Sequence, residues 1–197
     1  RAPWVSLLLW GAELAAVRLN ETRRVSELTG VEYEVLGNDD GNLTDDLRTR
    51  DELIAVIRRF QPDLLFTHRT NDYHTDHRHT GLLVQDASFL LGVPLVCPEV
   101  PCLRAMPVIL SFFDNFKKPV EFMADVAVDI DGAADAKAAM LDCHRSQFYD
   151  WLPWVEHQMD RLPPSQEDRL RWLDAITRER DAATARWVQE ATAPAPG

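Results

Sequence analysis

Residues 51–67, D-E-L-I-A-V-I-R-R-F-Q-P-D-L-L-F-T, decide the fold class of this chain. The apolar residues from Leu53 to Ile57 supply the stripe of a helix over Asp51–Phe60, and Gln61-Pro62 ends that helix. The short apolar run within Asp63–Thr67 is typical of a strand buried on both faces. A helix that leads directly into a buried strand indicates an alternating α/β arrangement, in which helices join parallel strands.

The same alternation extends toward the N-terminus. Val5–Trp10 predicts a buried strand, Glu13–Leu28 a helix that stops at Gly30, and the alternating residues 31–35 a further strand. The order strand, helix, strand, helix, strand predicts right-handed crossovers between parallel strands. We therefore expect an α/β protein with a doubly wound, mostly parallel sheet and helices on both faces.

The remainder of the chain continues as a mixture of helices and strands. The pattern predicts a helix over Arg78–Leu91, strands over Val108–Phe113 and Ala124–Ile130, and helices over Ala133–Ser146 and Ser165–Val188. No internal repeat and no low-complexity linker interrupts this series. One domain is therefore expected over residues 1–190, followed by a frayed tail over 191–197.

Composition argues against several kinds of partner. The 197 residues carry a net charge of −11, which disfavours nucleic acid and anionic membranes because clusters of Lys and Arg bind both. No apolar run approaches the ~20 residues of a membrane-spanning helix, and no signal peptide is recognisable, so a cytoplasmic location is expected. The cysteines form no C-x-x-C pair and are interpreted as reduced thiols: Cys97, Cys102 and Cys143.

The residues that follow Thr67 are the candidates for chemistry. Ligands of a parallel α/β sheet bind beyond the carboxyl ends of its strands, where His68–Thr80 (H-R-T-N-D-Y-H-T-D-H-R-H-T) begins. This segment holds four of the six histidines, and imidazole with carboxylate is the ligand set of a catalytic zinc. A solvated surface patch is the alternative. The compact H-x-D-H of His74, Asp76 and His77 favours a site, because a carboxylate can orient one imidazole while another binds metal.

This segment resembles the second signature of the PIG-L/LmbE-like de-N-acetylases, a family of Rossmann-like metal hydrolases. The matching residues are P-D-L-L-F-T-H at 62–68 and N-D-Y-H-T-D-H-R at 71–78, with Thr75 where the family usually has proline. Further likenesses follow chain order: R-L-N-E at 18–21, D-G-N-L at 40–43, D-V-A-V-D-I at 125–130 and H-R-S-Q at 144–147. Several ordered motifs across roughly residues 5–154 are more specific than H-x-D-H alone.

The resemblance implies an activity and a role for each signature residue. Family members remove acetyl from N-acetylglucosamine-type amides, so it implies an N-acetyl sugar or glycoconjugate as substrate and Zn²⁺ or another divalent metal as cofactor. His77 would be a metal ligand. His74 would protonate the leaving amine or steady the oxyanion, with Asp76 holding its imidazole and Tyr73 assisting at the oxyanion. Arg18 would bind substrate, although a solvated helix arginine is the alternative.

One family motif is absent. After its first strand the family has A-H-P-D-D-E, which supplies two metal ligands and the general base, and no H-P-D-D occurs in this sequence. Zinc needs about three protein ligands, so His77 alone would not hold it tightly. Since the chain also starts at Arg1 rather than Met, we expect an N-terminally truncated domain without its first strand and helix. The alternatives are a degenerate site, or replacement ligands among His68, Asp72 and His79.

Other functions are compatible with the same sequence. A non-catalytic sugar-binding module, or a metal hydrolase of esters or phosphoesters, would use the same fold. An aromatic group near the C-terminus is interpreted as core or subunit contact rather than as a glycan platform: Phe148, Tyr149, Trp151 and Trp154. Family members are often oligomers, so the resemblance also implies a homo-oligomer.

Overall fold

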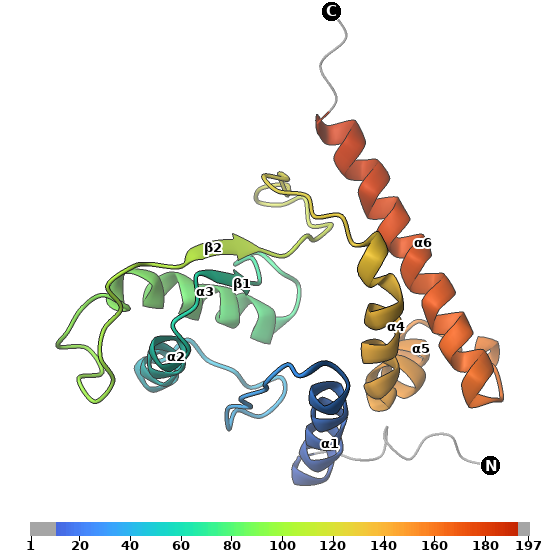
Figure 1. Ribbon diagram of the computed structural model, residues 1–197, viewed down its shortest axis with the longest axis horizontal. Coiled ribbons are helices and arrows are strands. Elements are labelled where there is room, and N and C mark those ends of the chain that lie inside the picture. Colours follow the sequence, from blue (N-terminus) through green and yellow to red (C-terminus); the bar gives the residue numbers. More distant parts are fainter. Residues whose placement is uncertain (1–10, 193–197) are drawn as a thin grey trace, which may run out of the picture. The chain divides into compact units, whose positions relative to one another are not determined.

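The computed structural model describes residues 11–192, which form two compact units (Figure 1). One unit spans Gly37–Met123. The other combines the described residues up to Leu36 with those from Ala124 onwards. The predicted strand Val5–Trp10 and residues 193–197 lie outside the described part of the chain.

The Gly37–Met123 unit contains the sheet. Its elements are, in chain order, α2 (Leu47–Phe60), β1 (Leu64–Thr67), α3 (Thr75–Leu90) and β2 (Val108–Ser111). β1 pairs with β2 in parallel, from Leu64 opposite Val108 to Thr67 opposite Ser111. Parallel neighbours need a crossover connection, which α3 and the loop after it supply. The α/β class and the parallel pairing are thus confirmed, and within the described residues the sheet consists of these two strands.

α2 and α3 pack together over a small apolar core. α2 begins earlier than predicted, because the Asp46 carboxylate caps it by accepting a hydrogen bond from the Thr49 N–H at 2.8 Å. It ends at Gln61, as the Gln61-Pro62 pair predicts. Gln61 is in the left-handed conformation, with φ 56°. The core consists of side chains from both helices and from the loop after α3: Ile54, Ile57, Ala87, Leu91 and Cys97.

Arg58 is buried beside this core and organises the proline-rich loop after α3. Its side chain is 1% exposed, and Nε donates to the Leu91 carbonyl at 3.1 Å. Nη1 and Nη2 donate to five further carbonyls, those of Leu90, Val93, Val96, Cys97 and Val100. A guanidinium carries five N–H donors in a planar fork, so one arginine can gather several carbonyls of a loop around it.

The other unit is helical over most of its described residues. Its long helices are α1 (Ala12–Thr29), α4 (Ala134–Cys143) and α6 (Gln166–Thr192), and α4 packs against both α1 and α6 (Figure 1). Its short elements are η2 (Asp131–Ala133), the π-helix η3 (Ser146–Trp151), α5 (Leu152–Val155) and η4 (Met159–Arg161). None of the helices in the described part of the chain is long and apolar enough to cross a membrane.

A buried carboxylate links two motifs in this unit. Glu21 on α1 is 4% exposed and accepts hydrogen bonds from the N–H and the hydroxyl of Ser146, both at 2.7 Å. Glu21 belongs to the R-x-x-E motif and Ser146 to the H-x-S-Q motif, 125 residues later. Lys137 on α4 donates to Asp181 of α6. The first link therefore joins α1 to η3, and the second joins α4 to α6.

Two predicted strands are wrong. Residues 31–35 and 124–130 have the alternation of strands, but neither forms a strand in the structure. Their apolar side chains are exposed, with Val35 63% and Val128 73% accessible. A strand forms only where a neighbour offers backbone donors and acceptors, and alternation alone does not provide one. Both segments adjoin the points where the chain passes from one unit to the other.

Candidate metal and catalytic site

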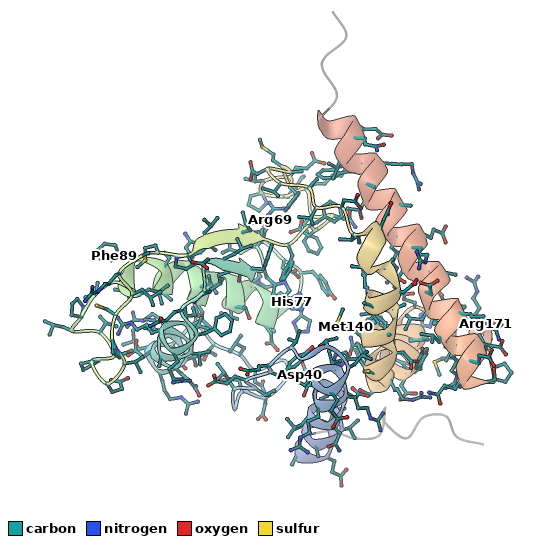
Figure 2. The ribbon with its side chains drawn as sticks, in the orientation of Figure 1. Asp40, Arg69, His77, Phe89, Met140 and Arg171 are labelled. Atoms are coloured by element: carbon teal, nitrogen blue, oxygen red, sulfur yellow. The ribbon has the colours of Figure 1, made fainter. Side chains whose placement is uncertain are left out.

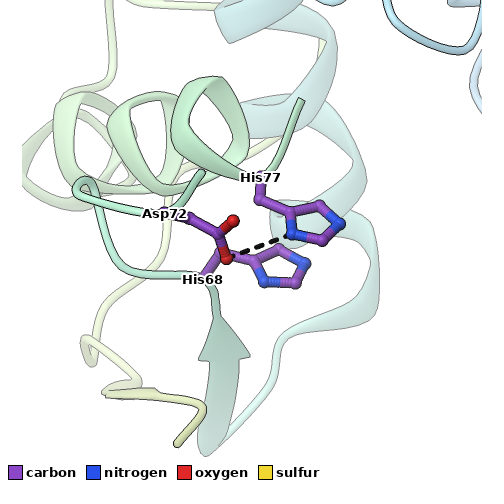
Figure 3. A group of neighbouring side chains, drawn as sticks. All are labelled: His68, Asp72 and His77. Carbon is purple, nitrogen blue, oxygen red and sulfur yellow. Dashed lines mark hydrogen bonds and ion pairs between the residues drawn. The ribbon is translucent and has the colours of Figure 1, made fainter. Parts of the chain in front are cut away.

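Three potential metal ligands gather at the end of β1. His68 directly follows the last residue of β1, Asp72 lies in the next loop, and His77 lies in the first turn of α3 (Figure 3). Each offers one ligand atom, and the three atoms lie within 4.8 Å of one another. Within residues 11–192 this is the one group of three or more His, Cys, Asp or Glu side chains with such spacing. The carboxyl end of β1, where ligands are expected in this fold class, is therefore where the donors meet.

Asp72 connects two of the histidines. Its Oδ2 lies 3.1 Å from Nδ1 of His77, and its Oδ1 accepts a hydrogen bond from the backbone N–H of His74 at 2.9 Å. Its side chain is 9% exposed. Sequence reasoning weighed Asp72 only as a replacement ligand and missed this pairing. The available signal was its position five residues before His77, across the start of a helix.

His68 and His77 stack face to face. Their ring centroids are 4.1 Å apart and their planes differ by 1°. Burial lowers the pKa of the His68 imidazole below its usual value of 6.5, and the nearby His77 acts in the same direction. Burial and the neighbouring His77 therefore favour the neutral form of His68, the form in which histidine binds metal.

His74 caps the N-terminus of α3 with its ring. Its Nδ1 accepts a hydrogen bond from the backbone N–H of Asp76 at 3.2 Å. A ring nitrogen that accepts carries no proton, so the neutral His74 ring has its proton on Nε2. The centroid of its ring is 4.7 Å from that of His77. The ring of Tyr73, which is 75% exposed, has its centroid 6.0 Å from that of His74. His74 therefore presents a donor next to the predicted metal ligand.

The Asp76 carboxylate holds a loop. Its oxygens accept hydrogen bonds from the N–H groups of Gly41 at 2.7 Å and Leu43 at 3.2 Å. Asp76 thus fastens the D-G-N-L loop to the start of α3, with Gly41 at φ 83°. We expected this carboxylate to hold the His74 imidazole, but the bond to that ring comes from the Asp76 backbone. The orienting role of the Asp76 carboxylate stays a prediction.

Neither Arg18 nor His79 belongs to the group of His68, Asp72 and His77. Arg18 lies on α1 in the other unit, where its Nε is buried and has no hydrogen-bond partner among the described residues. His79 Nδ1 lies 3.0 Å from Asp45 rather than beside His77. The structure therefore groups His74, His77 and Asp72 within one unit and leaves the binding role of Arg18 a prediction.

A hollow of about 450 Å³ adjoins His68. Its lining comes from the ends of β1 and β2, from α3 and from the loop after β2, and includes Thr67, His68, Ser111 and Val120. Arg69, labelled in Figure 2, steadies this loop by donating to Asp114 at 2.9 Å. Cavities of this size hold small-molecule ligands.

Gly81 allows α3 to approach this region closely. A Cβ atom at this position would lie 2.7 Å from the His68 carbonyl oxygen and 3.1 Å from the Arg69 carbonyl carbon. Real Cβ atoms do not come so near to a backbone, so any other residue would displace either the helix or the loop. The glycine thus fixes the distance between α3 and the end of β1.

Comparison with known proteins supports the resemblance found in the motifs. The family model of PIG-L, described as GlcNAc-PI de-N-acetylase, matches residues 3–88, which include the whole His68–His77 region. A solved structure, the N,N'-diacetylchitobiose deacetylase from Pyrococcus horikoshii, superimposes with a TM-score of 0.62 at 26% identity, over 81% of this chain and 61% of that one. Over these residues the chain is similar to the PIG-L/LmbE-like family.

The curated relatives of this chain differ in activity. The diacetylchitobiose deacetylase of Thermococcus kodakarensis is 29% identical over 156 residues, which are 73% of this chain and 55% of that protein. The 4-oxalmesaconate hydratase of Pseudomonas putida is 27% identical over 151 residues, which are 76% of this chain and 58% of that protein. The 4-carboxy-2-hydroxymuconate hydratase structure from Pseudomonas putida shares the fold, with a TM-score of 0.65 at 22% identity over 95% of this chain and 70% of its own. The chain thus spans little more than half the length of its curated relatives.

Proposed function

We propose that this chain carries the histidine half of the active site of a metal-dependent hydrolase that removes acetyl from an N-acetylglucosamine-type amide. The observation that carries the proposal is the grouping of His74, His77 and Asp72 at the end of β1, inside the segment that matches the family model. Diacetylchitobiose deacetylases among the relatives support an N-acetyl sugar as substrate.

The donor chemistry at the end of β1 fits a divalent metal such as zinc. Imidazole nitrogen and carboxylate oxygen are its usual ligands, and His77 keeps Nε2 available while Nδ1 faces Asp72. A bound zinc ion would polarise the amide carbonyl and lower the pKa of a water molecule to about 7. His68 and Asp72 are the neighbours that could complete the ligand set. The A-H-P-D-D-E motif, which in the family would supply further ligands and the general base, does not occur in these 197 residues.

His74 is proposed to act on the substrate directly. Its Nε2–H can donate a hydrogen bond to the oxygen that becomes negative when the acetamide carbonyl is attacked. To protonate the departing amine, His74 must act as an imidazolium that gives up its Nε2 proton and is left as a neutral ring with its remaining proton on Nδ1. The bond from the Asp76 N–H to Nδ1 keeps that ring in one orientation. Tyr73 and Arg18 are proposed as further contacts to the oxyanion and to the sugar, respectively.

Acetate release from diacetylchitobiose tests this proposal. The complete protein with zinc should release acetate, a chelator should abolish the release, and His74→Ala should lower the rate about 10²–10⁴-fold, the range expected for a general acid or base. Asp45→Asn, outside the histidine grouping, is the matched control. A His74→Ala protein that works at nearly the wild-type rate would contradict the role of His74. Chelator-insensitive sugar binding without acetate release would favour a binding module.

A hydratase is the second candidate, because one curated relative of similar identity is a hydratase. Addition of water to a carbon–carbon double bond needs the same kind of groups, a positioned water and a side chain that moves a proton. Assay of 4-oxalmesaconate beside the acetamide, an ester and a phosphoester separates the candidates. A cytoplasmic location and a homo-oligomer stay predictions of the sequence.

A further inference from the structure

Asp72 is a buried carboxylate with a donor at each oxygen. Oδ1 accepts from the His74 backbone N–H at 2.9 Å, and Oδ2 faces Nδ1 of His77 at 3.1 Å. The first of these partners can only donate. An ionised carboxylate can only accept, so the second contact is a hydrogen bond only if Nδ1 of His77 carries a proton. The neutral His77 ring then has no proton on Nε2, the nitrogen left for another ligand.

Neighbouring groups contact the His77 ring at one face and at one edge. Arg78 donates from Nη1 to the carbonyls of Asp72 at 2.9 Å and Tyr73 at 2.8 Å, which ties the loop to the first turn of α3. His68 covers one face of the His77 ring, with 4.1 Å between centroids. Figure 3 shows the three side chains with a dashed line between Asp72 and the His77 ring. These contacts favour one orientation of the ring in the metal-free chain.

We propose that Asp72 is a positioning residue that holds His77 in the tautomer with its proton on Nδ1 and so keeps Nε2 free to bind a metal ion. Through its other oxygen the same carboxylate fixes the backbone of His74, so one side chain sets both histidines. The use of Nε2 rests on the proposed function. The tautomer itself is a property of the metal-free chain.

Because Asp72 faces two donors, Asp72→Asn should keep one of its two hydrogen bonds and reverse the other. An asparagine side chain has one accepting oxygen and one donating amide group. The backbone N–H of His74 cannot change its role, so it keeps the oxygen, and the amide group then faces Nδ1 of His77. A donor at that position favours the tautomer with the proton on Nε2, which blocks the metal-binding nitrogen. The substitution preserves size and shape while it reverses the hydrogen bond.

Nitrogen-15 NMR of the histidine rings tests this proposal on the metal-free 197-residue chain at about pH 8.5, where an ordinary imidazole is neutral. The signals of His77 are assigned by their loss in His77→Gln. We expect mostly the Nδ1–H tautomer in the wild type and mostly the Nε2–H tautomer in Asp72→Asn. Asp45→Asn is the matched control, because Asp45 lies 3.0 Å from Nδ1 of His79, and it should leave the His77 signals unchanged.

Two results would overturn the role of Asp72. One is a wild-type His77 with its proton on Nε2, which decides the question even if Asp72→Asn does not fold. The other is an Asp72→Asn protein in which His77 keeps the Nδ1–H tautomer. Neither result depends on catalysis. A tautomer switch in Asp72→Asn without acetate release by the wild type would support the positioning role of Asp72 and contradict the deacetylase. Acetate release by the wild type without a tautomer switch in Asp72→Asn would support the deacetylase and contradict the positioning role.

Discussion

His68 shows how a single residue can report on the packing of the histidine grouping. Its ring is partly buried and stacks on His77 at 4.1 Å, and burial together with the neighbouring imidazole lowers the pKa of His68. In the unfolded chain the same ring has its ordinary pKa, near 6.5. Between the two values the unfolded chain binds a proton that the folded chain resists, so folding becomes less favourable as the pH falls.

We expect the free energy of unfolding of the metal-free protein to decrease from pH 7.5 to pH 5.5, in part through His68. His68→Phe keeps a flat ring over His77 but removes the titrating group, so its stability should depend less on pH over this range. Urea denaturation at both pH values, with a chelator present, measures the difference. His157→Asn, which replaces an exposed histidine at φ 55° with a residue that tolerates this conformation, is the control. An unchanged pH dependence in His68→Phe would contradict the prediction.

At the scale of elements, α2 and the loop after α3 depend on one cation. Arg58 is 1% exposed and donates to six backbone carbonyls between Leu90 and Val100. A buried carbonyl that loses its donor costs about 1–3 kcal/mol. The loop has little regular structure, so these bonds rather than a helix or strand ladder satisfy its carbonyls. The loop leads into β2, and its position therefore affects the sheet.

We predict that Arg58→Lys destabilises the protein by about 1–3 kcal/mol for each buried carbonyl that is left without a donor. The lysine keeps the positive charge but has three donors at one point and cannot reach six carbonyls. The shift of the urea midpoint measures this loss. Arg48→Lys, the same change on the exposed face of α2, should shift the midpoint by less than about 0.5 kcal/mol in stability. Equal midpoints for the two variants would show that the Arg58 bonds contribute nothing beyond charge.

At the scale of the whole molecule, the described residues divide into two units whose connecting segments are irregular. Within the described part of the chain, residues 126–130 donate no backbone–backbone hydrogen bond, whereas β1 and β2 pair along their full length. The segment 126–130 therefore has a strand-like sequence without strand hydrogen bonds.

Hydrogen exchange should separate these parts of the molecule. Amides of residues 126–130 should exchange within seconds to minutes, while those of β1, α3 and the middle of α2 should be protected, because exchange of a bonded amide requires local opening. Mass spectrometry of proteolytic peptides resolves the segments. Slow exchange in 126–130 would mean that this segment pairs as a strand after all, as its alternation predicts.

The features of the candidate site that depend on spacing along the chain were predictable from the sequence. The strand that ends at Thr67 places the following histidines at its carboxyl end, and His74 and His77 lie three residues apart at the start of a helix, so their proximity follows from local geometry. The partner of His77 was not predictable in this way. Asp72 and Asp76 each lie two residues from His74 in the sequence. Only the fold of the loop decides that the Asp72 carboxylate contacts the His77 ring and that the Asp76 carboxylate binds Gly41.

By itself the sequence determined the helices α1, α2, α3, α4 and α6, the strands β1 and β2, the α/β class and the segment that holds the histidines. These features depend on periodicity, caps and neighbours along the chain. Tertiary structure alone decided the burial of Arg58, the bond between Glu21 and Ser146, the pairing of Asp72 with His77 and the absence of strands at 31–35 and 124–130. Each of these depends on which distant backbone or side-chain groups are available as partners. Periodicity shows which face a residue occupies, but a hydrogen bond forms only when folding brings a matching donor and acceptor within about 3 Å.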